Sequence, residues 1–554
     1  MVVSLDHLSV NNRLLTIITL TLTYLTKFVL YRYLVELDEG LNAWQTIGAY
    51  TILVGVSMVL ACVGMRKGRV FLSLISMLLI DIWLVANIIY YKSNFLLLDW
   101  QVILIADNLN GFEDSIIAYL QWQIYLIPII TIVTAVFLIV NRSKIIQEPI
   151  SWKKFLFLPF SGFVIYLVGL GIGAIGNKVY ARENEDNWVF EQDKKLFLKI
   201  HSPIGHIGMV LWDGIEERIL HFKAIAPLSS HEKEILSAIY TGSMEDSILA
   251  NPPHAHMVFI LVESLESWPL LAKDINGVDV CENINQYIHS HNVLFCPNLT
   301  SQQVYGRSGD GQLITQTGLL PLSSGVTCMT HGGNVYPNYA HFYQDGVVLN
   351  PYSGIWNQRV TTYSYGYKRL RESSVLLRGT DSLMVSWAIE ELQKATEPTC
   401  VLLLTINTHA PFNSVESTLQ LPPIYSNIEA KYLQTVHYMD KHVGRFLAWA
   451  DTAQTMSDAT IVITADHNHF PRNNGKGLCP LIIKSPLIDH AYFIREAYQM
   501  DIFPTVLHAI GQTDYNWKGF GVDLLNDTVK RQISDQQAYA LSDKMIRTNF
   551  FKKE

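Results

Sequence analysis

Two apolar runs in the second half of the chain end in residues that could bind a metal ion. Residues 257–262 are followed by Glu263, and residues 460–465 are followed by Asp466 and His467. Carboxylate and imidazole groups placed after buried strands offer oxygen and nitrogen ligands to one divalent cation. Each residue alone also fits a solvated charge or a turn position. The metal hypothesis therefore requires that the three side chains meet.

A serine in a glycine-rich segment supplies a possible nucleophile. Ser308 lies in the segment 305–311 (YGRSGDG), ahead of a helix that we expect to begin near Gln312. A serine in such a segment is usually a turn residue. A bound metal ion would instead lower the pKa of its hydroxyl and present the oxygen to a phosphorus ester. Backbone N–H groups at the helix start would then face the phosphate.

Further side chains could contact a substrate. His409 follows another apolar run, where it could donate a proton to a leaving oxygen, bind a phosphate oxygen, or serve only as a loop histidine. Trp356 and Arg359 combine an aromatic ring with a base, which suits a head group and its phosphate, although Trp356 could equally be a core residue. Asp310 and His469 are two more candidates for substrate contact. Glu266 competes with the first carboxylate as a ligand, but we expect it in a first helical turn.

Strands and helices that would position these residues alternate from about residue 254 onward. The short apolar runs are residues 257–262, 400–406, 460–465 and 481–484, and residues 428–449 form a long amphipathic segment. Such alternation predicts an α/β domain with a mostly parallel central sheet. Ligands bind at the carboxyl ends of strands in such sheets. We therefore expect Glu263, His409 and Asp466 to share one site.

The first third of the chain is apolar enough to lie in a membrane. Of the 554 residues 49% are hydrophobic, and the excess is concentrated before residue 176. A helix needs roughly 20 apolar residues to cross a bilayer. Five stretches meet this length: residues 14–34, 44–65, 70–91, 121–140 and 155–175. The first contains Lys27, but its other residues are apolar enough to keep it as a span. No small-residue cleavage site follows it, so we do not expect a cleavable signal peptide.

Loop charges predict the orientation of these spans. Basic residues follow the second and fourth stretches, whereas the loops after the first and third are mainly acidic. The positive-inside rule then places the N-terminus in the cytoplasm, and five crossings place the chain outside after about residue 177. We expect a multi-pass protein of the cytoplasmic or inner membrane. Its predicted parts are a bundle (1–176), an amphipathic linker along the membrane (177–253), an extracytoplasmic catalytic domain (254–530) and a C-terminal tail (531–554).

Charge and cysteine content exclude some classes of function. The net charge of −8 gives no support for a nucleic-acid partner. Five of the six cysteines follow residue 177, and no CxxC motif occurs. We expect at most one or two disulfides, with Cys281 and Cys296 the closest pair in sequence, and no zinc finger.

The motifs, in this order, resemble those of the lipoteichoic acid synthase family. These are membrane phosphoglycerol transferases of the alkaline phosphatase and sulfatase superfamily. The resemblance rests on Glu263, the segment 306–310, Trp356-Asn357, Gly366-Tyr367, the segment 407–412 (NTHAPF), Asp466-His467 and the segment 501–505 (DIFPT). It implies a five-helix transmembrane bundle followed by an alkaline-phosphatase-like domain. It also implies that Glu263, Ser308, Asp466 and His467 hold one divalent ion, Mn²⁺ first, with Mg²⁺ or Zn²⁺ as alternatives.

The resemblance implies a two-step transfer. Ser308 would attack the phosphodiester of an anionic phospholipid such as phosphatidylglycerol and release diacylglycerol. An extracytoplasmic acceptor, a glycan or a glycerol-phosphate polymer, would then take the phosphoglycerol, with His409, Trp356 and Arg359 binding the phosphate and glycerol. Two residues depart from the family pattern: serine replaces the usual threonine nucleophile, and Gln358 replaces an arginine two positions after the tryptophan. The donor and acceptor are left open by these departures.

Three alternatives compete with this hypothesis. A phosphoethanolamine transferase acting on lipid A or a glycan would share the spans and the metal site, but its usual acidic and glycine run after Asp-His is missing here. A sulfatase-like hydrolase would need a proline two residues after Ser308 and an arginine two beyond it, where Asp310 and Gln312 stand. A degenerate scaffold protein would have lost at least one of the four metal-site residues.

Overall fold

The computed structural model contains a helical unit and a sheet unit. It describes residues 9–38, 41–62, 69–94, 97–104, 113–141, 152–183, 206–208, 210–212, 214–215, 227–240, 253–323, 325–353, 357–374, 380–412, 418–470, 476–526, 531 and 533–552. The helical unit comprises residues 1–103 and 116–218, and the sheet unit comprises residues 104–115 and 219–554. Most of the predicted linker, 177–253, lies outside the described residues.

Four helices in the first unit are long and apolar enough to cross a membrane. The helices of this part of the chain are α1 (Ser9–Leu34), α2 (Ala43–Ala61), α3 (Arg69–Asn94), α4 (Trp100–Leu104), α5 (Glu113–Ala118), η4 (Trp122–Tyr125), α6 (Leu126–Val140) and α8 (Trp152–Glu183). The membrane-length segments are Ala43–Ala61, Val70–Asn94, Trp122–Val140 and Leu156–Gly176. They match the second to fifth predicted spans. The first predicted span lies in α1, which is not one of the four, so the count of five is not confirmed.

Helix α1 carries a buried positive charge that neighbouring helices neutralise. Lys27 is 0% exposed, and its Nζ lies 2.6 Å from Asp81 Oδ1 on α3. The same ammonium group donates to the Thr131 hydroxyl on α6. Ionisable groups within apolar bundles are tolerated when they are paired in this way. Lys27, the charged residue within the first predicted span, thus links α1 to α3 and α6.

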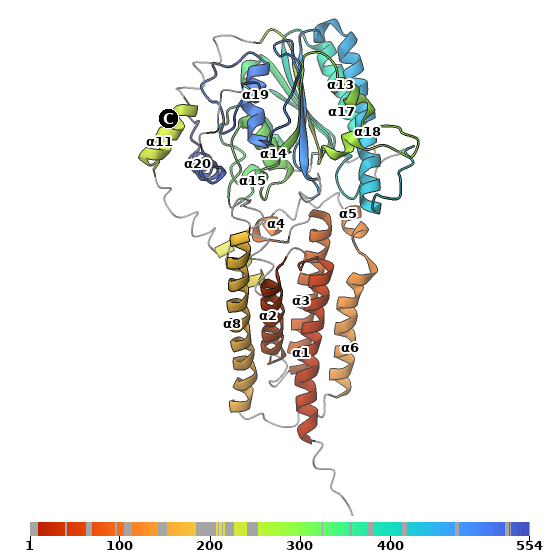
Figure 1. The fold of residues 1–554 in the computed structure, drawn as a ribbon, viewed down its shortest axis with the longest axis vertical. Coiled ribbons are helices and arrows are strands. Elements are labelled where there is room, and N and C mark those ends of the chain that lie inside the picture. The colour runs from red at the N-terminus through yellow and green to blue at the C-terminus, as the bar shows by residue number, and fades with distance from the viewer. Residues whose placement is uncertain are drawn as a thin grey trace, which may run out of the picture. The chain divides into compact units, whose positions relative to one another are not determined.

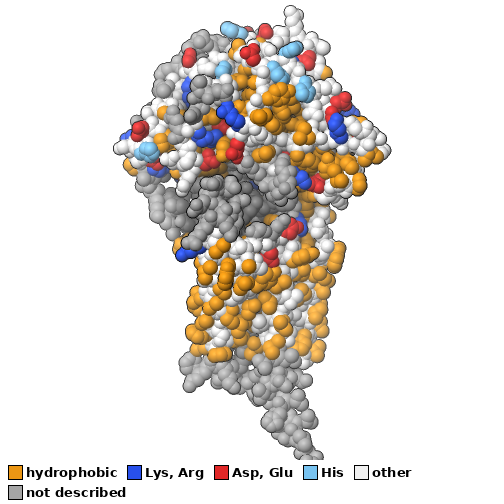
Figure 2. Space-filling view, in the orientation of Figure 1, with side chains coloured by type: hydrophobic (Ala, Val, Ile, Leu, Met, Phe, Trp, Pro, Cys, Tyr) orange, Lys and Arg blue, Asp and Glu red, His pale blue; other side chains and the backbone are white. Residues whose placement is uncertain are grey.

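The surface of the helical unit is apolar, as expected for a protein embedded in lipid (Figure 2). Phe71, Ile82 and Phe160 each have more than 60% of their area exposed. Inside the unit, α2 and α8 approach closely at glycines, since a Cβ on Gly55 would lie 2.5 Å from the Gly162 carbonyl oxygen. Small residues at helix contacts are typical of membrane bundles. The chain is therefore an integral membrane protein.

A mixed, mostly parallel sheet forms the centre of the second unit. Its strands are β1 (Met257–Val262), β2 (Val293–Thr300), β3 (Asp345–Asn350), β4 (Arg369–Glu372), β5 (Thr399–Leu404), β6 (Thr460–Ala465), β7 (Leu478–Lys484), β8 (Ala491–Tyr492) and β9 (Ala497–Tyr498). Their order is β4-β3-β5-β1-β6-β7-β2-β8, with β9 also paired to β2. The neighbouring strands β4, β3, β5, β1 and β6 run parallel to one another. Strand β7 is antiparallel to both β6 and β2. The predicted mostly parallel sheet is confirmed.

Helices cover both faces of this sheet (Figure 1). On one face lie α13 (Glu282–Ile288), α17 (Thr380–Lys394) and α18 (Asn427–Thr452), and on the other lie α14 (Ser308–Thr317), α15 (Thr327–Thr330) and α19 (Ile502–Ala509). Strands β1 and β6 are buried at every residue, which explains why their sequences are continuously apolar. The remaining helices are α11 (Ser230–Ile239), η5 (Trp268–Leu271), η6 (Tyr339–Phe342), α16 (Gln358–Ser364), η7 (Gln454–Met456), η8 (Gln499–Asp501) and α20 (Asp535–Arg547).

The C-terminal residues are folded, although we predicted a tail. Helix α20 buries Leu541, Ser542 and Met545. The Ser542 hydroxyl donates to the Leu320 carbonyl oxygen at 2.6 Å and accepts from the Leu320 N–H at 3.0 Å. All six cysteines are buried free thiols, so Cys281 and Cys296 are not joined.

Candidate active site

The three predicted metal ligands meet at the carboxyl ends of two neighbouring strands. Strands β1 and β6 pair in parallel with Val262 opposite Ala465, so the next residue of each, Glu263 and Asp466, emerges at the same edge of the sheet. One ligand atom from each of Glu263, Asp466 and His467 lies within 4.8 Å of the others. Parallel register therefore produces the cluster from residues about two hundred positions apart.

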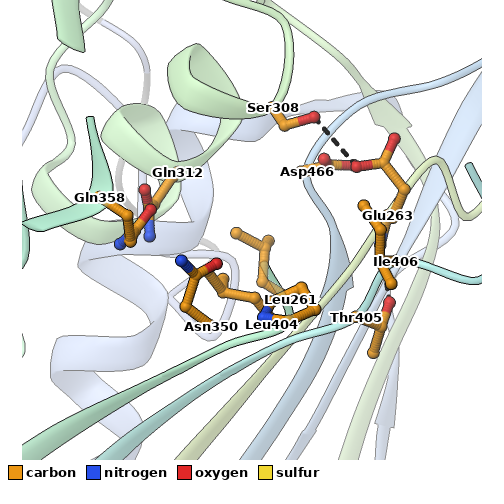
Figure 3. Close-up of a pocket in the computed structure, with 11 residues that line it drawn as sticks. Leu261, Glu263, Ser308, Gln312, Asn350, Gln358, Leu404, Thr405, Ile406 and Asp466 are labelled. Atoms are coloured by element: carbon orange, nitrogen blue, oxygen red, sulfur yellow. Dashed lines mark hydrogen bonds between the residues drawn. The ribbon is translucent and has the colours of Figure 1, made fainter. Parts of the chain in front are cut away.

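Ser308 lies against this cluster (Figure 3). Its Oγ donates to Glu263 Oε2 at 3.0 Å and lies 3.2 Å from His467 Nε2. Helix α14 begins at Ser308 itself, so the predicted helix start near Gln312 was four residues late. The preceding residue, Arg307, has φ 45° and ψ −116°, a conformation that is costly for a residue with a side chain. This sharp entry into the helix turns the serine toward the carboxylates.

The cluster has the charge and donor atoms that suit a divalent cation. Glu263 and Asp466 are almost fully buried, and neither pairs with a lysine or arginine in the described part of the chain. Burial, followed by the nearby Asp466, raises the pKa of Glu263, and burial lowers the pKa of His467 to about 4. His467 Nδ1 lies 2.9 Å from the Asn468 carbonyl oxygen and donates to it, so Nε2 keeps its lone pair. Two buried anions, a neutral imidazole nitrogen and a hydroxyl oxygen form a plausible ligand set.

The glycines of the nucleophile loop allow two backbones to come together. A Cβ on Gly311 would lie 1.9 Å from the Asp466 carbonyl oxygen. Only a residue without a side chain permits this approach, which brings the first turn of α14 onto the end of β6. Beneath the loop, Asp310 Oδ2 accepts from the N–H groups of Val304 and Gly306 at 2.9 and 2.8 Å. Burial raises the pKa of Asp310 to about 7. Asp310 is 1% exposed, a placement that suits shaping the loop rather than touching substrate.

Replacing Gly311 with alanine is expected to damage both stability and activity. The added methyl group overlaps a carbonyl oxygen, so α14 must move away from β6 and carry Ser308 with it. Overpacking of this kind typically costs about 1–3 kcal/mol. The thermal unfolding midpoint and the turnover of the purified chain measure the two effects. Gly333→Ala is the matched control, because a Cβ there meets its nearest atom at 3.7 Å. Equal behaviour of the two variants would contradict the close-approach argument.

Glu266 is a buried support of the site rather than a helical residue. It precedes η5, and its carboxylate accepts from the N–H groups of His469, Phe470 and Gly477 at 3.0, 2.6 and 3.0 Å. The Trp268 indole N–H also donates to it at 2.7 Å. Our expectation of a first helical turn was therefore wrong. The carboxylate instead holds the loop that follows Asp466 and His467.

The other predicted site residues differ in their surroundings. His409 follows β5 by five residues, and its Nδ1 donates to the Ala410 carbonyl oxygen at 2.6 Å. Burial lowers the pKa of both His409 and His469. The His469 ring packs edge-on against Phe412 and Phe470 at 4.9 and 4.8 Å between ring centres. Trp356 lies outside the described residues.

Arg359 is not among the residues that line the pocket beside Ser308. Its Nη2 lies 2.6 Å from Glu372 Oε1, and its side chain is 75% exposed. The residue before it, Gln358, lines the pocket instead. Because Gln358 begins α16, the two neighbours point in different directions, which sequence alone could not decide.

Arg307 is a positively charged residue next to the nucleophile, and it was not among the predicted site residues. It makes no ion pair with any described residue, yet its charge affects the pKa of His409, His467 and His469. An arginine that is close to three histidines and next to the serine is well suited to an anionic substrate group. Its position directly before the nucleophile was the signal that could have identified it.

Two known protein families match separate parts of the chain. The lipoteichoic acid synthase N-terminal domain matches residues 3–191, and the sulfatase family matches residues 327–512. The chain is lipoteichoic acid synthase-like in both of these parts. It is similar to lipoteichoic acid synthase 1 of Bacillus subtilis (strain 168), with 22% identity over 514 residues that cover 83% of this chain and 76% of the relative. The lipoteichoic acid synthase of Staphylococcus saprophyticus is 21% identical over 576 residues, which cover 93% and 84% of the two chains.

A solved structure extends the fold likeness across both units. The integral membrane lipooligosaccharide phosphoethanolamine transferase A from Neisseria meningitidis has 13% identity and a TM-score of 0.54, covering 89% of this chain and 95% of that one. As a lipoteichoic acid synthase-like protein, the chain is a membrane-bound phosphotransferase. The sulfatase match begins after Ser308 and therefore includes neither Glu263 nor Ser308. The roles of these two residues are argued from the geometry of the site.

Proposed function

We propose that the chain transfers a phosphoglycerol-type head group from an anionic phospholipid to an extracytoplasmic hydroxyl group, through an ester on Ser308. One observation carries the proposal: Ser308 Oγ lies 3.0 Å from Glu263 Oε2 and 3.2 Å from His467 Nε2, inside a buried cluster of metal-type ligands. A hydroxyl in that position is a nucleophile for a phosphodiester. The related lipoteichoic acid synthases support the choice of donor and of a glycerol-phosphate or glycan acceptor.

Glu263, Ser308, Asp466 and His467 would hold one divalent ion, with Mn²⁺ as the first choice and Mg²⁺ or Zn²⁺ as alternatives. The ligand set fits because two buried carboxylates otherwise lack a cation in the described residues. When bound, such an ion would lower the pKa of the serine hydroxyl and offset the charge of the phosphate.

The transfer has two balanced halves. In the first, a bond forms between Ser308 Oγ and phosphorus while the bond from phosphorus to the diacylglycerol oxygen breaks. Ser308 gives up a proton, and the departing oxygen takes one up. In the second, the acceptor oxygen bonds to phosphorus, the serine ester breaks, and Ser308 regains a proton. His409 Nδ1 donates to the Ala410 carbonyl oxygen, which leaves the lone pair on Nε2, so we propose that Nε2 accepts the proton of the acceptor hydroxyl.

The membrane unit would supply the lipid from the outer leaflet. A phospholipid cannot leave the bilayer cheaply, so an enzyme anchored beside it gains access by lateral diffusion. If α1 is a fifth span, the basic loops place the N-terminus in the cytoplasm and residues 254–530 outside. Reporter fusions after residues 66 and 554 test this orientation: we expect the first to be cytoplasmic and the second extracytoplasmic.

We propose that Arg307 binds the phosphate of the substrate and that Arg359 does not. Arg307→Gln is expected to lower kcat/KM by about 10- to 100-fold, since a hydrogen bond to a charged group contributes about 1.5–3 kcal/mol. Arg359→Gln removes an exposed ion pair and is expected to change kcat/KM by less than about fivefold. Head-group release from a fluorescent phosphatidylglycerol compares the two. A larger loss in the Arg359 variant would contradict this assignment.

One assay separates the proposal from its rivals. The purified full-length chain, supplied with Mn²⁺, is incubated with phosphatidylglycerol or phosphatidylethanolamine and a hydroxyl acceptor. We expect diacylglycerol and transferred phosphoglycerol from the first lipid. Preferential release from phosphatidylethanolamine would favour a phosphoethanolamine transferase, and release without transfer would favour a sulfatase-like hydrolase. No release, together with no bound metal, would favour a scaffold.

A further inference from the structure

Four exposed apolar side chains stand on two loops of the sheet unit. Leu271, Ile275, Val278 and Ile424 have 86%, 59%, 42% and 80% of their areas exposed. The first three lie on the loop after β1, and the fourth lies on the loop after β5. We call these four residues the apolar rim. Large apolar side chains that gather at exposed positions mark an interaction surface.

A backbone hydrogen bond and an aromatic contact join the two loops. The Ile275 N–H donates to the Gln420 carbonyl oxygen at 2.8 Å. Trp268 on the first loop and Tyr425 on the second have ring centres 6.1 Å apart. Because the loops touch at both places, the apolar rim is one surface rather than two separate exposures.

The tip of the first loop is a tight turn with a fixed shape. Asp274 Oδ1 accepts from the N–H groups of Asn276 and Val278 at 2.7 and 2.9 Å. The Asp274 N–H in turn donates to the Val278 carbonyl oxygen at 2.8 Å. Beside the turn, Lys273 Nζ lies 2.6 Å from Asp279 Oδ1. The charges of the loop are thus matched within it, so its apolar tip can enter a less polar medium at little electrostatic cost.

The apolar rim lies at the edge of the sheet that carries the active site. Strands β1 and β5 are parallel neighbours, so the loops that follow them leave from the carboxyl ends, where Glu263 also emerges. Ile424 lies three residues before α18, which returns the chain to the start of β6. Leu487 is a contrast, since it is 59% exposed but follows β7, which is antiparallel to β6. Leu487 therefore lies at the opposite edge.

A lipid bilayer fits the apolar rim better than a second protein does. The chain is an integral membrane protein, so a bilayer is tethered to the sheet unit at high effective concentration. Four side chains offer roughly a few hundred Å², less than the about 800 Å² per partner that a specific protein interface needs. Apolar side chains that enter a bilayer surface are buried at the boundary of head groups and acyl chains. Tryptophan and tyrosine, which stand beside the rim, are enriched at such interfaces.

We propose that the apolar rim inserts into the surface of the bilayer and docks the active-site edge of the sheet unit on the lipid. Docking would bring the head group of a phospholipid to Ser308 while its acyl chains stay in the bilayer. This consequence for catalysis rests on the proposed function, whereas the docking itself does not.

Fluorescence quenching tests the insertion without turnover. Full-length Ile424→Cys and Leu487→Cys chains are labelled with bimane and reconstituted in vesicles of phosphatidylcholine and phosphatidylglycerol with brominated acyl chains. The Ile424 label is expected to be quenched several times more strongly than the Leu487 label, because only the first enters the region of the acyl chains. The native cysteines are buried, so the parent chain treated with the same reagent measures the background.

Two results of this measurement would overturn the proposal. One is equal quenching of the two labels by the brominated chains. The other is shielding of the Ile424 label from aqueous iodide without quenching by the brominated chains, which would indicate a protein partner.

A double variant, Leu271→Ser with Ile424→Ser, tests the consequence for catalysis. Both side chains are mostly exposed, so we expect the unfolding temperature of the parent chain to be kept. For phosphatidylglycerol in a bilayer, kcat/KM is expected to fall at least about tenfold, since the apolar contact with lipid is lost. For the water-soluble p-nitrophenyl ester of glycerol phosphate, it is expected to change by less than about twofold. Leu487→Ser is the matched control, and we expect it to change neither value.

The outcomes separate this inference from the proposed function. Equal loss of both activities in the double variant would show that the rim supports the fold of the site, and would overturn the docking. Selective quenching of the Ile424 label in a chain that releases no head group would support the docking and overturn the proposed function. Head-group release by a chain whose Ile424 label is not quenched would overturn the docking and leave the function standing.

Discussion

Ser308→Ala is expected to reduce head-group transfer by about a thousandfold or more, because it removes the atom that forms the ester and leaves the pocket otherwise intact. The fold should persist, since Ser308 is partly exposed at the first position of α14 and its hydroxyl contacts only Glu263 and His467 in the described structure. Diacylglycerol released from phosphatidylglycerol by the purified chain measures the loss.

Ser308→Thr is the matched variant for this experiment. Threonine retains the hydroxyl, and related synthases are expected to use threonine at this position, so we expect transfer to be kept within about tenfold. Mass spectrometry of the parent chain, quenched during turnover without acceptor, should find phosphoglycerol on the peptide that contains Ser308. A Ser308→Ala chain that still transfers the head group would refute the covalent route.

Glu263→Gln is expected to separate metal binding from the stability of the metal-free fold. Burial and Asp466 raise the pKa of Glu263, so the folded protein holds this carboxylate at a cost when no cation is present. A glutamine removes that cost, and the metal-free variant should unfold at the same temperature as the parent chain or higher. Addition of Mn²⁺ at a hundred times its Kd should stabilise the parent chain by about 2.7 kcal/mol and the variant by much less.

The Glu263→Gln variant should also have lower catalytic activity than the parent chain. Replacing a residue that supports a metal ligand typically costs 10- to 100-fold in metal affinity or activity, and we expect loss of the ligand Glu263 to cost more than about 100-fold. Metal content, unfolding temperature with and without Mn²⁺, and turnover are measured together, with Glu282→Gln on the exposed face of α13 as the control. Equal stabilisation of the Glu263→Gln and parent chains by Mn²⁺ would place the metal elsewhere.

Much of the fold could be predicted from the sequence because the pattern of apolar residues is strong. β1 and β6 were predicted at their observed bounds, since both are buried on two faces and read as continuous apolar runs. The amphipathic segment 428–449 lies within α18. Segment ends were less accurate: β7 begins three residues earlier than predicted, where its burial is partial at Leu478. Helix α20 was not anticipated within the predicted tail, because it has a polar outer face and few apolar residues to signal its packing.

The metal ligands could be predicted because strand ends in a parallel sheet share an edge. Glu263 and Asp466 needed only the strand assignments and the parallel arrangement. The pocket wall could not be predicted in this way. Asn350, Gln312 and Gln358 come from a strand end, a helix face and a helix start, and no spacing in the sequence links them. Arg359 was chosen over Gln358 because it carries a charge, whereas the start of α16 directs Gln358 to the pocket.

The sequence alone determined that an apolar helical part precedes an α/β domain, and that two carboxylates and a histidine stand at the ends of buried strands. These features are local, because burial and strand ends are recorded in the order of neighbouring residues. The tertiary structure alone decided that Gly311 brings Ser308 onto the end of β6, and that three amides face the serine across one pocket. Such contacts join segments far apart in the chain, and the packing of α14 and α16 around the sheet sets which side chains meet.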